Sequence, residues 1–230
     1  MKRFVVLSGA GVSAESGIRT FRDSDGLWEN YNVRDVADIE GWYRNRKLML
    51  DFYNERRRQL EKALPNKAHE TIAALERYFE VTVVTQNVDN LHERAGSTNV
   101  IHLHGELTKI RPEDKADKGI RDIGYKDVNL GDTDERGVQF RPHIVWFGEA
   151  VPMIEPAAKA VSQADILLII GTSLNVYPAA GLFRYARYGT PIFLIDPQKI
   201  DLDYPNFRQI RKPATKGMEE LMEILVEQYI

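Results

Sequence analysis

A glycine-rich segment near the start of the chain has the spacing of a nucleotide-binding loop. Residues 9–14 read GAGVSA, fit the pattern G-x-G-x-x-G/A and directly follow the apolar run Arg3–Leu7. Glycines at these positions let the backbone turn tightly and approach a pyrophosphate, which the N–H groups of a following helix stabilise. The pattern alone is equally typical of a plain tight turn. Its place directly after a predicted strand favours a dinucleotide site.

The segment that follows these glycines argues against a dehydrogenase. A hydride-transfer fold would continue into a full helix, a second strand and, about 20 positions on, an acidic residue that binds the ribose. Residues 17–28 instead read GIRTFRDSDGLW, a polar stretch with aromatic residues and no strand periodicity. Such a loop suits an enzyme that consumes its dinucleotide, because it can cover the reacting end of that molecule.

Polar residues also follow three other predicted strands. They are residues 86–92 (QNVDNLH), residues 102–105 (HLHG) and residues 171–173 (GTS). The ends of parallel strands face one crevice, where ligands bind. Because Asn and Asp are also common helix caps, a segment such as Asn-Val-Asp is by itself more typical of turn chemistry. Strand alternation puts His102 and His104 on the same side, but His104 abuts Gly105, where the strand ends and a side chain can meet a ligand.

The elements that would position these residues are strands alternating with helices. Short runs rich in β-branched residues predict buried parallel strands at Arg3–Leu7, Glu80–Thr85, Asn99–Leu103, His143–Phe147, Asp165–Ile170 and Pro191–Ile195. Helices are predicted at about Arg46–Lys62, Lys67–Tyr78, Ile154–Gln163 and Ala179–Tyr188, and an apolar stripe from Met218 to Tyr229 predicts a last one. This order predicts the α/β class, with a Rossmann-like, mostly parallel sheet and helices on both faces.

One long stretch interrupts that pattern. Residues 106–142 contain 17 charged residues and four glycines without a long apolar run, which is too much chain for an ordinary loop. We expect a small inserted subdomain, formed together with about residues 33–65, within a single domain that spans residues 1–230. Its apolar residues would form a satellite core from Ile110, Ile120, Ile123, Tyr125, Val128, Leu130, Val138 and Phe140.

The composition excludes several classes of protein. Lys+Arg 31 against Asp+Glu 34 gives a net charge of −3, unlike the basic balance of most nucleic-acid-binding proteins. The N-terminal apolar run is too short for a signal peptide, and no run approaches the ~20 residues that span a bilayer. The absence of cysteine excludes disulfides and thiolate metal sites. We therefore expect a cytoplasmic protein that binds neither nucleic acid nor membrane.

Taken together, the motifs resemble those of the sirtuins, which are NAD-dependent protein lysine deacylases. The matching segments are residues 9–22 (GAGVSAESGIRTFR), 85–92 (TQNVDNLH), 102–105 (HLHG), 145–149 (VWFGE) and 171–173 (GTS). They cover most of the chain in the family's order. Residues 52–58 (FYNERRR) are similar to the bacterial branch that includes desuccinylases and demalonylases.

The resemblance implies a role for each matching residue. The residues implied to bind NAD are Gly9, Ala10, Gly11, Ser13, Ala14, Phe21, Arg22, Trp28, Gln86, Asn87, Val88, Asp89, Gly171, Thr172, Ser173, Asp196, Pro197, Gln198 and Ala214. The catalytic residues would be His104 as general base, with Asn87 and Asp89 around the nicotinamide and its ribose. The substrate, an acylated-lysine protein or peptide, would contact Tyr53, Arg56, Val145, Phe147, Gly148 and Glu149, the last four largely through backbone strand addition.

The family's chemistry consumes NAD. The acyl oxygen of the substrate lysine displaces nicotinamide from the ribose, and the acyl group ends on ADP-ribose while the lysine is freed. His104 would remove a proton from a ribose hydroxyl, a task that suits an imidazole because its ordinary pKa of about 6.5 lies near working pH.

Two departures from the family are visible. Sirtuins usually carry four cysteines that hold a structural zinc, whereas residues 106–142 contain neither Cys nor His. We therefore expect no zinc, and a subdomain held by apolar contacts and ion pairs. The family also commonly has Asn after the strand that ends at Ile195, where this chain has Asp196, which can still accept hydrogen bonds from a ribose.

Acyl preference depends on Tyr53 and Arg56. They stand three residues apart in a predicted helix and so project from one face. A guanidinium can hold a carboxylate bidentately, and a tyrosine hydroxyl can add a hydrogen bond. By itself Arg56-Arg57-Arg58 is more typical of a solvated charged face, and the resemblance reverses that interpretation in favour of succinyl and malonyl groups alongside acetyl.

Two other functions stay open at this point. One is an NAD-dependent protein ADP-ribosyltransferase, which shares the displacement of nicotinamide. The other is a non-catalytic NAD-sensing module, against which the presence of His104, Asn87 and Asp89 counts. The sequence does not indicate the physiological substrates or the oligomeric state.

Overall fold

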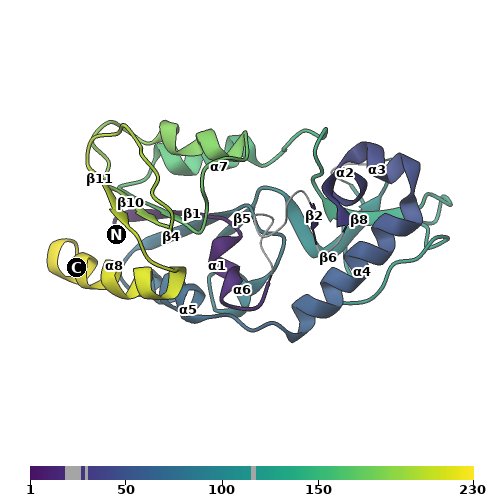
Figure 1. The fold of residues 1–230 in the computed structure, drawn as a ribbon, viewed down its shortest axis with the longest axis horizontal. Coiled ribbons are helices and arrows are strands. Elements are labelled where there is room, and N and C mark those ends of the chain that lie inside the picture. The colour runs from purple at the N-terminus through teal and green to yellow at the C-terminus, as the bar shows by residue number, and fades with distance from the viewer. Residues whose placement is uncertain (19–26, 29–30, 115–117) are drawn as a thin grey trace.

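The computed structural model describes residues 1–18, 27–28, 31–114 and 118–230, and its centre is a six-stranded parallel sheet (Figure 1). The strands are β1 (Arg3–Ser8), β4 (Glu80–Thr85), β5 (Val100–His102), β9 (Ile166–Ile170), β10 (Ile192–Ile195) and β11 (Phe207–Ile210). They lie in the order β5-β4-β1-β9-β10-β11, and every neighbouring pair is parallel. In chain order this is 3-2-1-4-5-6, the arrangement of a doubly wound dinucleotide-binding fold.

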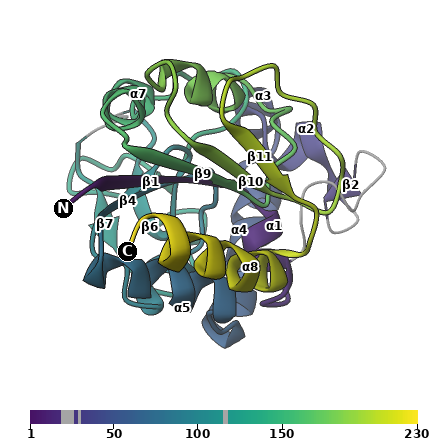
Figure 2. The ribbon, with the colours of Figure 1, turned by 90° about the vertical axis from the view of Figure 1, so that its left-hand side faces the viewer.

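Helices cover both faces of the sheet, which is why its strands are nearly continuous apolar runs. Phe4 and Val6 of β1 face α5 (Lys67–Ala74), the short 3₁₀ helix Leu75–Arg77 and α8 (Ala214–Gln228). Val5 and Leu7 face α7 (Ile154–Ser162) and the 3₁₀ helix Ala179–Tyr185. Figure 2 shows α7 and α8 on opposite sides of the strands. The predicted fold class is confirmed.

A smaller lobe lies at the end of the molecule away from α8 (Figure 1). Three helices, α2 (Val33–Val36), α3 (Ile39–Arg44) and α4 (Arg46–Lys62), pack there against the antiparallel strands β6 (Gly105–Pro112), β7 (Arg121–Asp122) and β8 (Phe140–Ile144). The remaining elements are α1 (Gly11–Ala14), α6 (Leu91–Arg94) and the hairpin of β2 (Leu27–Trp28) and β3 (Tyr31–Asn32). No helix in the described part of the chain has both the length and the apolar character needed to cross a membrane.

Several predicted elements differ from the structure. The strand predicted at His143–Phe147 is wrong as a member of the central sheet, because β8 ends at Ile144 and pairs antiparallel with β6. Within the predicted satellite core, Ile110, Val128 and Phe140 are buried, whereas Ile120 and Leu130 are exposed. The helix predicted at 179–188 is a 3₁₀ helix that ends at Tyr185, and the edge strand β11 was not predicted.

An ion-pair network of two buried arginines and a part-buried carboxylate stabilises the smaller lobe. The two terminal nitrogens of Arg141 lie 2.8 Å from the two carboxylate oxygens of Glu149, and Arg111 lies 3.2 Å from one of them. The guanidinium of Arg141 also lies 3.5 Å from the centre of the Trp146 ring. Bidentate pairs and cation–π contacts of this kind are among the stronger polar interactions in proteins when they are desolvated.

Candidate active site

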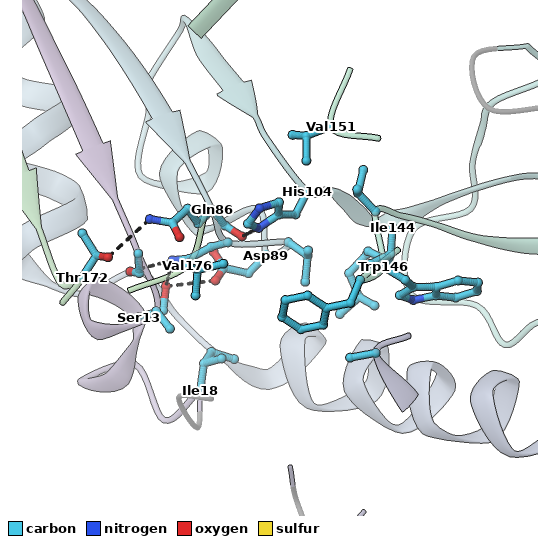
Figure 3. Close-up of a pocket in the computed structure, with 18 of the residues that line it drawn as sticks. Ser13, Ile18, Gln86, Asp89, His104, Ile144, Trp146, Val151, Thr172 and Val176 are labelled. Carbon is cyan, nitrogen blue, oxygen red and sulfur yellow. Dashed lines mark hydrogen bonds between the residues drawn. The ribbon is translucent and has the colours of Figure 1, made fainter. Parts of the chain in front are cut away.

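A cavity of about 620 Å³ lies between the carboxyl ends of the central strands and the smaller lobe. Most of the site residues predicted from the sequence line this cavity. They are Gly9, Ala10, Ser13, Gln86, Asn87, Val88, Asp89, His104, Gly171, Thr172, Ser173, Tyr53, Arg56, Val145, Phe147, Gly148 and Glu149. The 3-2-1-4-5-6 strand order explains why these residues come together. The connections that follow the adjacent strands β1 and β9 run to opposite faces of the sheet, which opens a crevice between them. Figure 3 shows His104 between the polar group around Ser13 and the apolar group around Trp146.

The glycine loop after β1 packs directly on the loop after β9. The backbone N–H of Gly9 donates to Ile170 at 3.0 Å, and that of Gly11 donates to Gly171 at 2.8 Å. A Cβ on Gly9 would lie 2.7 Å from the Cβ of Thr172, and one on Gly11 would lie 2.7 Å from the Cα of Gly171. Larger residues would therefore separate the two loops, and the glycines keep open a cradle that a diphosphate fits.

A buried polar network joins that cradle to the segment after β4. The hydroxyl of Ser13 donates to Asp89 at 2.9 Å, and the side-chain amide of Asn87 donates to Ser13 at 3.1 Å and to the carbonyl of Gly9 at 3.2 Å. Burial raises the pKa of Asp89 above its ordinary value, against the hydrogen bonds that it accepts. These contacts hold Asn87 and Asp89 rigidly at the cavity wall.

Behind this network lies a pair of buried histidines, His69 and His92, to which we assigned no role from the sequence. Nε2 of His69 lies 3.4 Å from the Ser13 hydroxyl, and Nε2 of His92 lies 3.0 Å from the hydroxyl of Ser8. Burial lowers the pKa of His69 to about 4 and that of His92 well below its ordinary value. Both rings are therefore neutral at working pH and support the cavity wall from the core.

His104 stands at the turn between β5 and β6 and faces the cavity (Figure 3). Its Nδ1 lies 3.0 Å from the carbonyl oxygen of Gln86. Burial lowers the pKa of His104 below its ordinary value, although this hydrogen bond raises it. Gly105 follows with φ +80°, and a Cβ there would overlap the carbonyl oxygen of His143 in β8, so only glycine lets the strands meet directly after His104.

The far end of the cavity is formed by one face of α4. Tyr53 is 1% exposed and Arg56 is 5% exposed, and both line the cavity. Arg57 is also buried, and donates to Asn54 and to the carbonyl of Leu107. Only Arg58 is exposed, where it pairs with Asp127 at 2.7 Å. A solvated charged face is therefore the wrong interpretation for two of the three arginines.

The loop after β8 closes the cavity on the side of the smaller lobe. The backbone N–H of Phe147 donates to Ala37 at 2.9 Å, and its carbonyl accepts from Ile39 at 3.0 Å. Phe147 is nevertheless 47% exposed as a residue and lines the cavity, although its backbone is hydrogen-bonded within the chain. Glu149 turns its carboxylate inward to Arg141 and Arg111.

Comparison with known proteins agrees with this geometry. Residues 9–178, which include every residue that lines the cavity, match the Sir2 family. The chain belongs to the Sir2 family. It is 51% identical over 228 residues to an NAD-dependent protein deacylase of Helicobacter pylori, with 99% of each chain covered. It is 53% identical over 232 residues to one from Bacteroides thetaiotaomicron, with 98% of this chain and 99% of that one covered.

A solved structure of a Sir2 homologue in complex with NAD has the same fold. It superposes with a TM-score of 0.85 at 38% identity and covers 98% of this chain and 90% of that one. The family match and this shared fold agree with the NAD cofactor expected from the sequence.

Some residues predicted for a Sir2 cofactor site do not line the cavity. Among the described residues these are Gly11, Ala14, Asp196, Pro197, Gln198 and Ala214. Asp196 is buried at the end of β10, where its carboxylate accepts from the N–H of Gln198 at 3.0 Å. Phe21 and Arg22 lie outside the described residues, and so does the side chain of Trp28. Their roles stay predictions.

Sequence reasoning missed the apolar part of this Sir2 cavity. The additional lining residues include Ile18, Leu60, Leu107, Ile144, Trp146, Val151 and Val176. An apolar residue in a sequence is more often part of a core than of a pocket, so no local pattern distinguishes them. Trp146 lay inside a motif that we recognised, yet its side chain was given no role.

One cluster of possible metal ligands occurs among the described residues. Ligand atoms of Glu93, His102 and Glu106 all lie within 4.8 Å of one another. His102 is already paired with Glu93 at 2.6 Å, and Glu106 with Lys109 at 2.7 Å. This cluster contains no thiolate and so differs from the four-cysteine zinc site of Sir2 proteins.

Proposed function

We propose that this chain is an NAD-dependent protein-lysine deacylase that removes succinyl and malonyl groups as well as acetyl groups. One observation carries the proposal: His104 and the Tyr53–Arg56 pair line the same cavity. The relatives' name, NAD-dependent protein deacylase, supports the NAD-dependent deacylation of proteins. The removal of succinyl and malonyl groups is inferred from Tyr53 and Arg56 of α4 alone.

The loops after β1 and β9 would hold NAD by its diphosphate. Gly9 and Gly171 offer backbone without side chains, and Thr172 and Ser173 offer hydroxyls at the same wall. When bound, NAD supplies an electrophilic ribose carbon with nicotinamide as the leaving group. Asn87 and Asp89 are held by Ser13 and would orient the nicotinamide end.

His104 acts as the general base. Because a carbonyl oxygen can only accept, Nδ1 carries the proton that is donated to Gln86, and Nε2 keeps its lone pair. In that tautomer Nε2 takes a proton from a ribose hydroxyl, which makes the hydroxyl oxygen a nucleophile. The lowered pKa of His104 keeps the ring neutral, and therefore basic, at physiological pH.

The acyl chain would extend from His104 toward α4. Leu60, Leu107 and Ile144 form apolar walls there, which suit the methylenes of a short acyl group. A carboxylate at the end of that group meets Arg56, whose guanidinium offers a planar fork, and the hydroxyl of Tyr53. Acetyl groups, which are shorter and uncharged, would use only the first part of this path.

The test compares Arg56→Met with Arg58→Met. Both variants remove a guanidinium from α4, but Arg58 is exposed and pairs with Asp127 away from the cavity. A charge-assisted hydrogen bond contributes about 1.5–3 kcal/mol, so Arg56→Met should lower kcat/KM for succinyl-lysine peptides about ten- to a hundredfold. Acetyl-lysine peptides should be affected far less, and Arg58→Met should leave both values unchanged.

Mass spectrometry of the products completes this experiment. Nicotinamide together with free lysine identifies a deacylase, whereas nicotinamide with ADP-ribosylated protein identifies a transferase. An equal loss for acetyl and succinyl peptides in Arg56→Met would make Arg56 structural and end the acidic-acyl part of the proposal.

A further inference from the structure

The hydroxyl of Tyr53 already accepts a hydrogen bond inside the protein. The indole Nε1 of Trp146 donates to it over 2.8 Å, and the two side chains are 1% and 2% exposed. Burial raises the pKa of Tyr53 well above its ordinary value of 10. The phenol therefore keeps its proton throughout the working pH range.

This bond determines what Tyr53 can offer to a ligand. A phenol has one proton to donate, and an indole N–H can only donate. Because Trp146 occupies the oxygen as a donor, the tyrosine proton must go to another group. Within the described part of the chain this hydroxyl donates no hydrogen bond, and Tyr53 lines the cavity. Its proton is thus available to an acceptor that enters the cavity.

Trp146 is itself held from three sides. The guanidinium of Arg141 stacks 3.5 Å from its ring centre, and the carboxylate of Glu149 accepts its backbone N–H at 2.9 Å. The ring of Trp42 lies 5.5 Å away, centre to centre. A cation over the ring withdraws electron density from the indole and so strengthens its N–H as a donor. The ion-pair network of the smaller lobe is therefore connected, through Trp146, to the hydroxyl of Tyr53 at the cavity.

We infer that Trp146 is a positioning residue for acyl selectivity: its N–H directs the Tyr53 hydroxyl to donate to the terminal carboxylate of succinyl- and malonyl-lysine. This inference rests on the proposed acidic-acyl activity and adds a residue to it. In this role Trp146 carries no charge and does not need to touch the substrate. Its contribution is to stop the tyrosine hydroxyl from acting as an acceptor.

The experiment removes the N–H of Trp146 in two variants, of which the second keeps the ring volume nearly unchanged. Trp146→Phe is the simple variant, and replacement of Trp146 by 3-benzothienylalanine, in which sulfur stands for the N–H, keeps the bicyclic ring. Trp42→Phe is the matched control, because it keeps an aromatic ring beside Trp146 and removes an indole N–H that donates to Glu113 at 2.9 Å and not to Tyr53. Each protein is assayed with acetyl- and succinyl-lysine peptides of identical sequence.

Loss of one neutral hydrogen bond should raise KM for the succinyl peptide about three- to tenfold, with kcat changed less. The ratio of succinyl to acetyl kcat/KM should fall in both Trp146 variants and stay constant in Trp42→Phe. In a Tyr53→Phe background, Trp146→Phe should cause no further change in this ratio, because the hydroxyl on which it acts is absent.

The outcomes separate the two proposals. If Tyr53→Phe and Arg56→Met lower the ratio but the benzothienylalanine protein keeps it, the role of Trp146 is wrong while the acidic-acyl activity stands. Equal losses for both peptides in the benzothienylalanine protein would likewise overturn it, because they show a structural role alone. If the unmodified enzyme does not act on succinyl-lysine, both proposals fall.

Discussion

Nδ1 of His104 lies 3.0 Å from the backbone carbonyl oxygen of Gln86, and this contact fixes the tautomer of the imidazole. Gln86 begins the segment that carries Asn87 and Asp89, so the imidazole is anchored to the same segment as the residues proposed to orient the nicotinamide. The cavity-facing nitrogen is thereby left as an acceptor before any ligand binds.

His104→Ala should abolish deacylation without loss of the fold. General-base catalysis typically contributes 10²–10⁴-fold, so kcat/KM with an acetyl-lysine peptide should fall by about that factor. The thermal midpoint and the affinity for NAD, measured by calorimetry, are the controls for folding. A well-folded His104→Ala protein with turnover near that of the parent enzyme would remove His104 from the mechanism.

The activity should persist below neutral pH. Because burial lowers the pKa of His104, the neutral base stays populated as the pH falls past 6.5, the ordinary value for histidine. The acid limb of kcat/KM, recorded between pH 5 and 9, should therefore have its midpoint below 6.5. A midpoint clearly above 6.5 would indicate a charged His104 and contradict the assigned tautomer.

Stability should depend on pH through His69. Its pKa is lowered by burial from 6.5 to about 4, so the unfolded chain binds a proton more readily than the folded one. The contribution of His69 to the free energy of unfolding should be constant above pH 6.5. It should fall by about 3 kcal/mol as the pH is lowered from 6.5 to 4. Urea titrations of the parent protein and of His69→Gln should show a shallower decline in the variant, and identical slopes would exclude this role.

Arg141 should be a main support of the smaller lobe. Arg141→Met leaves the inward-facing carboxylate of Glu149 with Arg111 as its remaining ion-pair partner, and breaking a buried pair costs about 3–5 kcal/mol. Urea unfolding should report this loss. Arg136→Met is the control, since Arg136 pairs with Asp114 and Asp134 at the surface and its removal should hardly change stability. Similar losses in the two variants would contradict the assignment.

Metal ions should not be required. With no cysteine, the chain lacks the thiolates that hold zinc in related proteins, and the buried arginine network supports the same lobe. Added EDTA or zinc should change neither turnover nor thermal midpoint, and elemental analysis should find no stoichiometric zinc. Tightly bound zinc would show that carboxylate or imidazole ligands, such as Glu93, His102 and Glu106, have replaced the thiolates.

Much of the central architecture could be predicted from local patterns. Five predicted strands lie in the parallel sheet, because a strand buried on both faces must be apolar along its whole length. The motifs at the strand ends were equally readable, since the topology of a parallel sheet brings its carboxyl ends to one edge. For the same reason His104, Asn87 and Asp89 were expected in one crevice, and they line one cavity.

The smaller lobe was decided by contacts between segments far apart in the chain. Helical spacing placed Tyr53 and Arg56 on one face of α4, but whether that face is buried depends on strands far along the chain. These are β6 (Gly105–Pro112) and β8 (Phe140–Ile144). A run of three arginines gives no local sign that two are buried and one is exposed. The bond from Trp146 to Tyr53 joins residues 93 positions apart, and only the folded chain brings the indole and the hydroxyl within hydrogen-bond distance.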